Sequence, residues 1–368
     1  MKNVQTTGNR EPFLRIARRD GVTTKDSILI RAAAIFAALI VDALFIFFVT
    51  GLNPLNVYVV MFTGTFGNFM RLKWAVEELA KLLLVGIALA PAFKMRFWNI
   101  GAEGQILMGG LATAFCMIRF GNSMPTWLLF VTMFVTSIAI GALWGIIPAF
   151  FKARWNTNET LFTLMMNYVA IQLVAYSTNI WRGQASSLGR INPGTEAGWF
   201  PSIMGQRCTI NIIVIALLTV AMFIYLKYSK HGFEIAVVGE SENTARYAGI
   251  NVRKVILRTM AISGAICGLG GLFIVAGNSQ TIATTSAGGR GFDAIIVAWL
   301  AKFNTFYMVL ISFLIVFLEK GASQIATSYS IMNDYSADVI SGIILFFILG
   351  SEFFINYRLI FRNGGKNA

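Results

Sequence analysis

The chain has 368 residues, of which 56% are hydrophobic and 13% are charged, and its mean hydropathy is +0.67. A soluble domain carries about twice this fraction of charged residues, so the composition excludes an ordinary soluble protein. The net charge of +13 does not indicate nucleic-acid binding, because the basic residues are divided among alternate loops rather than gathered on one face. We therefore expect an all-α polytopic membrane protein.

Ten apolar segments are predicted to form helices in the membrane: 29–50, 77–94, 98–118, 126–150, 158–178, 209–226, 257–277, 291–303, 305–319 and 337–357. A regular crossing needs about 20 apolar residues. The segment 291–303 is shorter than this and follows a glycine-rich stretch. It is therefore expected to be a half-helix or a re-entrant segment, which must be surrounded by protein or by a water-filled cavity.

The distribution of Lys and Arg predicts how these segments are oriented. With a cytoplasmic N-terminus, 20 of these residues fall in cytoplasmic segments and eight on the outer side. Because cytoplasmic loops are enriched in Lys and Arg, both termini are predicted to be cytoplasmic. The prediction divides the chain into a cytoplasmic segment (1–28), one membrane domain (29–357) and a cytoplasmic tail (358–368). The longest loops are 229–256 inside and 179–208 outside.

Polar residues stand at the beginning of one apolar segment, FWNIGAEGQILMGGLATAF at 97–115. Asn99 and Glu103 are four residues apart and project from one helical face, and Gln105 follows. In one interpretation Asn99 caps the helix and Glu103 interacts with its dipole. In the other, these groups face a cavity or a solute pathway, because polar side chains inside a membrane are costly.

A second polar pattern occurs in WNTNETLFTLMMNYVAIQL at 155–173. Glu159, Thr163 and Asn167 recur every four residues and form a polar stripe on a helix. Asn156 and Glu159 resemble a capping box, which would make Glu159 structural. Asn167 lies more than two turns beyond Glu159. It is expected either to join neighbouring helices through hydrogen bonds or to line a pathway.

A third pattern is GGRGFDAIIVAWLAKF at 288–303, where Asp293 begins a short helix after several glycines. Its carboxylate could stabilise the positive end of the helix dipole. Alternatively, the helix is one of the broken helices with which transporters border a central cavity.

The fourth pattern, HGFEIAVVGESENTARYAGINV at 231–252, lies on the predicted cytoplasmic side. Residues 242–248 are predicted to form a short helix that ends at Gly249. A solvated loop is the simpler interpretation of such a mixed-charge segment. Its many apolar residues instead favour a surface on which a soluble partner docks.

Together the four patterns resemble the permease subunits of bacterial ABC importers for nucleosides and related simple sugars. The resemblance rests on NIGAEGQ (99–105), NETLFTLMMNY (158–168), GESENTARYAGINV (239–252) and GFDAIIVAWL (291–300). The chain is similar to the longer of the two permeases in such systems. It departs from them at Asn243-Thr244, where Asn-Pro is usual, at Arg290, where an aromatic residue is usual, and near Thr305, where a proline is usual.

The resemblance implies an ABC-importer-type permease domain at 29–357 in the bacterial cytoplasmic membrane. It implies a substrate path that includes Asn99, Glu103, Gln105, Glu159, Thr163, Asn167 and Asp293. The residues implied to couple the chain to an ATPase are Gly239, Glu240, Asn243, Arg246, Tyr247 and Gly249.

The resemblance also implies a heterodimer with a second permease, cytoplasmic ATP-binding subunits and an extracytoplasmic solute-binding lipoprotein. The chain has no G-x-x-x-x-G-K-[ST] motif, so ATP is expected to bind to the partner subunits and this chain is expected to hold no cofactor.

An ion-coupled secondary transporter of a small polar solute is the main alternative, because acidic residues in its membrane segments could bind coupling ions. An intramembrane protease is a weaker alternative. Its serine form needs a histidine in the membrane, whereas the single histidine of this chain, His231, is predicted to be cytoplasmic. The three cysteines are scattered and show no metal-binding spacing. We therefore expect a transport subunit without enzymatic activity or a metal site, whose exact solute the sequence does not identify.

Overall fold

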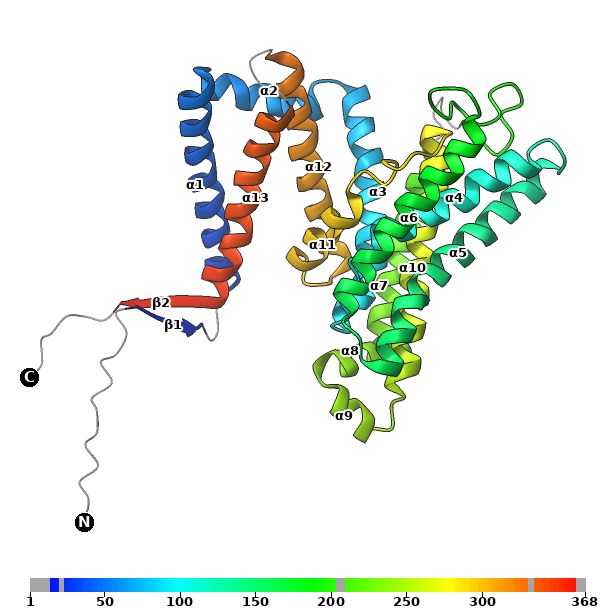
Figure 1. The fold of residues 1–368 in the computed structure, drawn as a ribbon. Helices are drawn as coiled ribbons and strands as arrows, with labels where there is room; N and C mark the ends of the chain where they lie inside the picture. Colours follow the sequence, from blue (N-terminus) through cyan, green and yellow to red (C-terminus); the bar gives the residue numbers. More distant parts are fainter. Residues whose placement is uncertain (1–13, 20–22, 203–208, 330–333, 362–368) are drawn as a thin grey trace, which may run out of the picture. The chain divides into compact units, whose positions relative to one another are not determined.

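The computed structural model describes residues 14–19, 23–202, 209–329 and 334–361. Parts of the predicted cytoplasmic segment (1–13 and 20–22), outer loop (203–208) and tail (362–368) lie outside these ranges. Figure 1 shows the helices α1 (Thr24–Thr50), α2 (Pro54–Phe66), α3 (Phe69–Lys94), α4 (Ala102–Phe120), α5 (Thr126–Trp155), α6 (Glu159–Arg182), α7 (Thr209–Tyr228), α8 (Lys230–Glu240), α9 (Glu242–Tyr247), α10 (Val252–Leu272), η1 (Phe273–Ser279), α11 (Arg290–Leu300), α12 (Thr305–Ser328) and α13 (Asp334–Asn356). Two strands, β1 (Leu14–Arg18) and β2 (Tyr357–Phe361), complete the described elements.

Seven helices in the described ranges are long and apolar enough to cross a membrane. They are α1, α5, α6, α7, α10 continued by η1, α12 and the main part of α13. The prediction of an all-α polytopic membrane protein is thereby confirmed in its general form. α11 has 11 residues and is about 16 Å long, which is too short for a crossing, as the sequence predicted.

The contacts divide the chain into two compact units, residues 1–67 with 318–368 and residues 68–317. In the first unit, α1 packs against α13, and Arg31 forms an ion pair with Glu352. β1 and β2 form an antiparallel pair in which Leu14 lies opposite Phe361. These strands were not predicted from the sequence.

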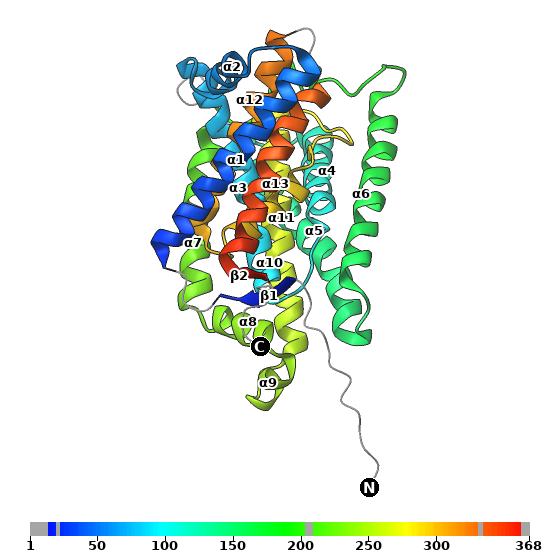
Figure 2. The same cartoon turned by 90° about the vertical axis from the view of Figure 1, so that its left-hand side faces the viewer.

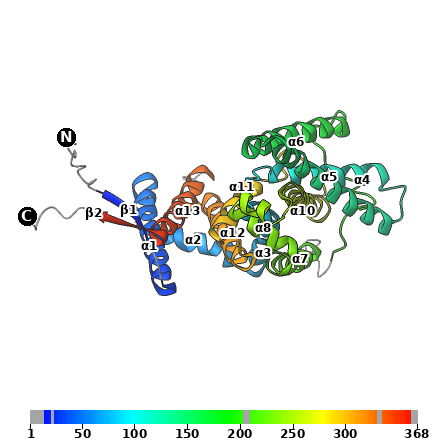
Figure 3. The same ribbon diagram turned by 90° about the horizontal axis from the view of Figure 1, so that it is seen from below.

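In the second unit, α10 packs against α3, α4 and α5, and Figure 3 shows it beside α4 and α5. The contact with α5 is close because both helices present glycines. A Cβ atom on Gly264 would clash with the carbonyl oxygen of Gly141, and one on Gly268 would clash with that of Ser137. Small residues of this kind allow membrane helices to approach at backbone distance. α10 therefore forms the core of this unit.

Several boundaries differ from the prediction. α3 begins at Phe69 rather than 77, because the side chain of Asn68 accepts a hydrogen bond from the Arg71 backbone N–H and caps the helix. The predicted span 257–277 is an α-helix that continues as the π-helix η1, where the Asn211 side chain donates to the Phe273 carbonyl oxygen at 3.2 Å. The helices α2 and α8 were not predicted.

Candidate functional site

The link between α3 and α4, residues 95–101, is an irregular stretch between two largely buried helices. Two side chains of α6 form hydrogen bonds with backbone groups of this link. Thr163 accepts a hydrogen bond from the Ile100 N–H at 3.2 Å and donates to the Trp98 carbonyl oxygen at 3.3 Å. The Asn167 amide donates to the Ile100 carbonyl oxygen at 2.9 Å. Such bonds allow irregular backbone at membrane depth, where water does not replace a missing partner.

Asn99 and Gln105 form a second set of buried bonds beside this link. The Gln105 amide donates to the Asn99 side-chain oxygen at 3.2 Å, and the Asn99 amide donates to the Ser263 hydroxyl on α10 at 3.2 Å. Gly101, not Asn99, is the N-cap residue of α4. The interpretation of Asn99 as the cap of α4 is therefore wrong, and its side chain instead ties the link to α10.

Glu103 connects α4 to α11. Its two carboxylate oxygens accept hydrogen bonds from the Gly289 and Gly291 backbone N–H groups, each at 2.8 Å. These two groups lie at the N-terminus of α11, where backbone N–H groups lack partners within the helix and attract negative charge. Glu103 therefore accepts hydrogen bonds from the N-terminus of α11, although Gly289 is 186 residues away from Glu103 in the sequence. We name Asn99, Glu103, Gln105, Thr163, Asn167 and Ser263 the polar brace.

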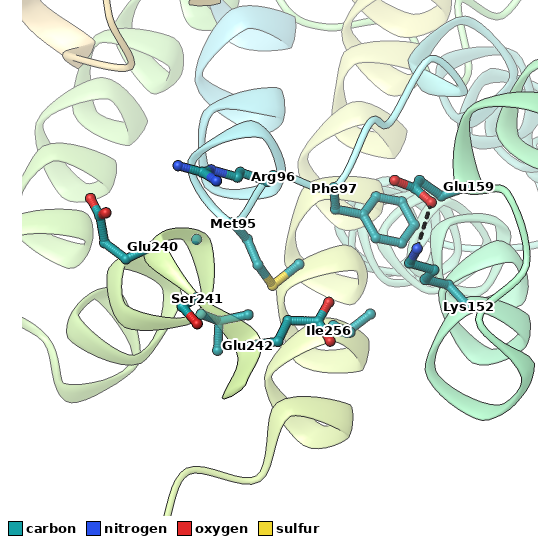
Figure 4. A pocket seen from close by; sticks show the side chains of 11 residues that line it. Met95, Arg96, Phe97, Lys152, Glu159, Glu240, Ser241, Glu242 and Ile256 are labelled. Atoms are coloured by element: carbon teal, nitrogen blue, oxygen red, sulfur yellow. Dashed lines mark ion pairs between the residues drawn. The ribbon is translucent and has the colours of Figure 1, made fainter. Parts of the chain in front are cut away.

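Two further predicted path residues lie outside the polar brace. Asp293 is half-buried, and its carboxylate has no hydrogen bond or ion pair with the described residues, although the charges of Glu103 and Arg290 act on it. Glu159 forms a 2.9 Å ion pair with Lys152 of α5, as Figure 4 shows. The capping-box interpretation of Asn156 with Glu159 is wrong, because Asn158 caps α6 and Asn156 ends α5 in a left-handed conformation.

A cluster of four charged residues joins α3 to α11. Lys81 pairs with Glu77 at 3.1 Å and with Glu78 at 3.0 Å, and Arg290 pairs with Glu78 at 2.6 Å. Arg290 was noted in the sequence as a departure from the family, whereas Glu77 and Glu78 were not selected. Their three- and four-residue spacing from Lys81 is the signal that could have identified the pairs within α3.

The helices α8 and α9 lie in the predicted cytoplasmic loop 229–256. α9 spans Glu242–Tyr247, and Gly249 adopts a φ of +77°, which confirms the predicted short helix and its glycine ending. Tyr247 is 93% exposed. A Cβ atom on Gly239 would clash with the Lys94 carbonyl oxygen, so α8 lies directly against the end of α3. A pocket between α8, α9 and the link that follows α3 is lined in part by Arg96, Glu240 and Glu242 (Figure 4).

His231 holds the base of α8 in place. It is buried beside α7 and α10, where its ring nitrogens contact the Tyr225 and Thr259 hydroxyls. Burial lowers the pKa of His231 below its usual value of 6.5, and the nearby charge of Arg258 acts in the same direction. His231 is therefore a structural residue in α8.

These features define a multi-pass membrane protein with a buried polar region beside the short helix α11, an arrangement typical of transport proteins. A family described as "Branched-chain amino acid transport system / permease component" matches residues 76–349. The chain belongs to this family, and it is a permease component of an ABC transporter rather than an enzyme.

Three relatives illustrate the range of the family. The guanosine ABC transporter permease protein NupP of Bacillus subtilis is 31% identical, over 88% of this chain and 93% of that protein. The glucose ABC transporter permease protein TsgB13 of Haloferax volcanii is 28% identical over 86% of each chain. The guanosine ABC transporter permease protein NupQ of Bacillus subtilis is 24% identical, over 56% of this chain and 67% of that protein.

Proposed function

We propose that this permease forms the translocation path of an importer for nucleosides or related neutral polar solutes. The main support is its similarity to NupP over nearly the full length of both chains. Because TsgB13 is named as a glucose transporter permease, simple sugars are the second substrate class to be tested.

The proposed path includes the seven residues selected from the sequence: Asn99, Glu103, Gln105, Glu159, Thr163, Asn167 and Asp293. Five of them belong to the polar brace, where their polar groups are engaged by the described neighbours. We propose that these five shape the wall of the path and hold α11 in position. Asp293 is proposed to contact the solute, because its carboxylate is half-buried and has no bonding partner among the described residues. A carboxylate accepts hydrogen bonds from sugar hydroxyls and from the N–H groups of bases.

The proposed assembly contains a second permease, cytoplasmic ATP-binding subunits and an extracytoplasmic solute-binding lipoprotein. The similarity of the chain to both NupP and NupQ supports pairing of two related permeases. α9 with Gly239, Glu240, Asn243, Arg246, Tyr247 and Gly249 would dock on an ATP-binding subunit, which would bind the ATP. We further propose that about ten helical segments lie in a bacterial cytoplasmic membrane, with both termini in the cytoplasm.

Competition for uptake tests the proposed solute class. Proteoliposomes that contain the complete complex would be supplied with the binding lipoprotein and radiolabelled guanosine. Excess unlabelled nucleosides should abolish uptake of the label, whereas glucose and fructose should leave it unchanged. Competition by the sugars alone would refute the nucleoside assignment and favour the sugar class.

A further inference from the structure

A second pocket, which is basic, lies at the end of the second unit that carries α8 and α9. It is formed by the end of α5, by α9 and by the beginning of α10, and Figure 2 shows the turn between α5 and α6 at the same end. Its volume is about 390 Å³, which lies within the range of small-molecule sites. Its lining includes one acidic side chain, Glu242, and four basic ones, Lys152, Arg154, Arg246 and Arg253. We name it the α5–α9 pocket.

The positive charge of this pocket is only partly balanced. Lys152 has an acidic partner at 2.9 Å, and Arg246 has one at 3.4 Å. Arg154 and Arg253 are exposed and form no ion pair with the described residues. These two arginines belong to different helices, α5 and α10, so an anionic group in the pocket would form charge-assisted hydrogen bonds with both.

The length of α5 places the α5–α9 pocket at the level of the lipid head groups. α5 has 30 residues and is about 45 Å long, whereas the hydrocarbon layer of a membrane is about 30 Å thick. The last turn of α5 therefore extends beyond the hydrocarbon. Trp155, which lines the pocket, ends this turn and is 59% exposed. Tryptophan rings are enriched at the boundary between membrane and water, which agrees with this placement.

An apolar groove begins next to this pocket. It follows the surface of α6 from Thr157 to Val169, a distance of about 18 Å along a helix. This is similar to the depth of one lipid leaflet, which is half of the ~30 Å hydrocarbon layer. Methionine side chains are flexible and adapt to an irregular partner. The groove is lined mainly by the apolar side chains of Leu161, Phe162, Met165, Met166 and Val169. We name it the α6 groove.

The pocket and the groove are adjacent. Asn156 lines the α5–α9 pocket, and the next residue, Thr157, lines the α6 groove. The rings of Trp155, Phe151 and Phe162 form a row, with centroids 5.3 Å and 4.9 Å apart. Trp155 belongs to the pocket and Phe162 to the groove. A single molecule with an anionic head and an apolar tail would therefore occupy both.

We propose that the α5–α9 pocket and the α6 groove together bind an anionic phospholipid. Its phosphate would contact Arg154 and Arg253, and one acyl chain would lie along the α6 groove. Basic pockets between membrane helices bind acidic lipid head groups in this way. The groove alone would suit any lipid, so the two arginines would give the site its preference for negative charge. Because Arg246 lies on α9, the lipid would also connect the proposed coupling helix to α5 and α10. The identity of the transported solute does not affect this site.

Titration of lipid into the delipidated complete complex, followed by native mass spectrometry, tests the site. Phosphatidylglycerol, which is anionic, should bind more tightly than phosphatidylcholine, which has no net charge. Arg253→Gln should weaken the first phosphatidylglycerol about five-fold, and Arg154→Gln combined with Arg253→Gln about thirty-fold. Lys254→Gln is the matched control, because it removes the same charge from the next residue, which does not line the pocket. It should leave the affinity unchanged. Equal affinity for both lipids, or normal affinity in the double variant, would overturn the proposal.

Two further comparisons test the acyl chain and the other molecules that could cover this surface. Glycerol phosphate has the anionic head without acyl chains, so an equal concentration of it should not displace phosphatidylglycerol. Displacement would show that the α6 groove takes no part, which would overturn its assignment. Selective binding of phosphatidylglycerol should also be the same in the isolated permease and in the complete complex. Its loss in the complex would assign the surface to a partner subunit and would overturn the lipid site.

Discussion

Removal of the Glu103 carboxylate should loosen the beginning of α11. In the wild type, two backbone N–H groups donate to this buried carboxylate at 2.8 Å. A buried group that loses its only partner costs about 1–3 kcal/mol, so Glu103→Ala should destabilise the permease by about 2–6 kcal/mol. Glu103→Gln keeps one oxygen as an acceptor and should cost about half as much. Thermal unfolding of the purified permease in lipid nanodiscs measures the difference.

A matched control separates this effect from the general loss of a carboxylate. Glu159→Ala removes the partly exposed ion pair with Lys152, which is worth at most about 1 kcal/mol. Uptake per folded complex should be strongly reduced in Glu103→Ala and partly retained in Glu103→Gln. If Glu103→Ala unfolds at the wild-type temperature, its hydrogen bonds do not hold α11. If uptake per folded complex is also normal, Glu103 has no role in the path.

The remaining predictions concern the solute, the cytoplasmic helices and the orientation of the chain. Asp293→Asn should reduce uptake without lowering the unfolding temperature, because Asp293 has no bonding partner among the described residues; a lower unfolding temperature would assign it a structural role. Gly239→Val should displace α8 from the end of α3 and reduce transport-coupled ATP hydrolysis, and normal coupling in the assembled complex would contradict the close contact. The folded state binds a proton at His231 less readily than the unfolded state, so the contribution of His231 to stability should be constant above about pH 6.5 and should fall below it. His231→Gln should lack this dependence in unfolding scans across pH. A single cysteine that replaces Ser187 should be labelled from outside the cell, whereas one that replaces Ser241 should be labelled only after permeabilisation. Labelling of both from one side would refute the predicted topology.

Local signals in the sequence predicted features that depend on neighbouring residues. Gly249 was identified as a helix ending because a left-handed residue there favours glycine, and the structure has that conformation. The polar residues at 99–105 and 159–167 were selected because they interrupt apolar segments. The partners of these residues could not be derived, because they are distant in the sequence. Ser263 is 164 residues from Asn99, and Gly289 is 186 residues from Glu103.

Other features were missed because the signal was ambiguous. The strands β1 and β2 pair segments from opposite ends of the chain, and no local pattern specifies such pairing. α8 follows α7 almost directly, and only the capping side chain of Ser229 marks its beginning.

The energy source of uptake distinguishes an ABC-transporter permease from an ion-coupled secondary transporter. Proteoliposomes that contain this permease, its second permease and the ATP-binding subunits would be assayed for guanosine uptake with the binding lipoprotein outside. We expect uptake that requires ATP hydrolysis and continues when proton and sodium gradients are dissipated. Uptake by the permease alone, driven by an ion gradient without ATP, would contradict it and identify an ion-coupled secondary transporter.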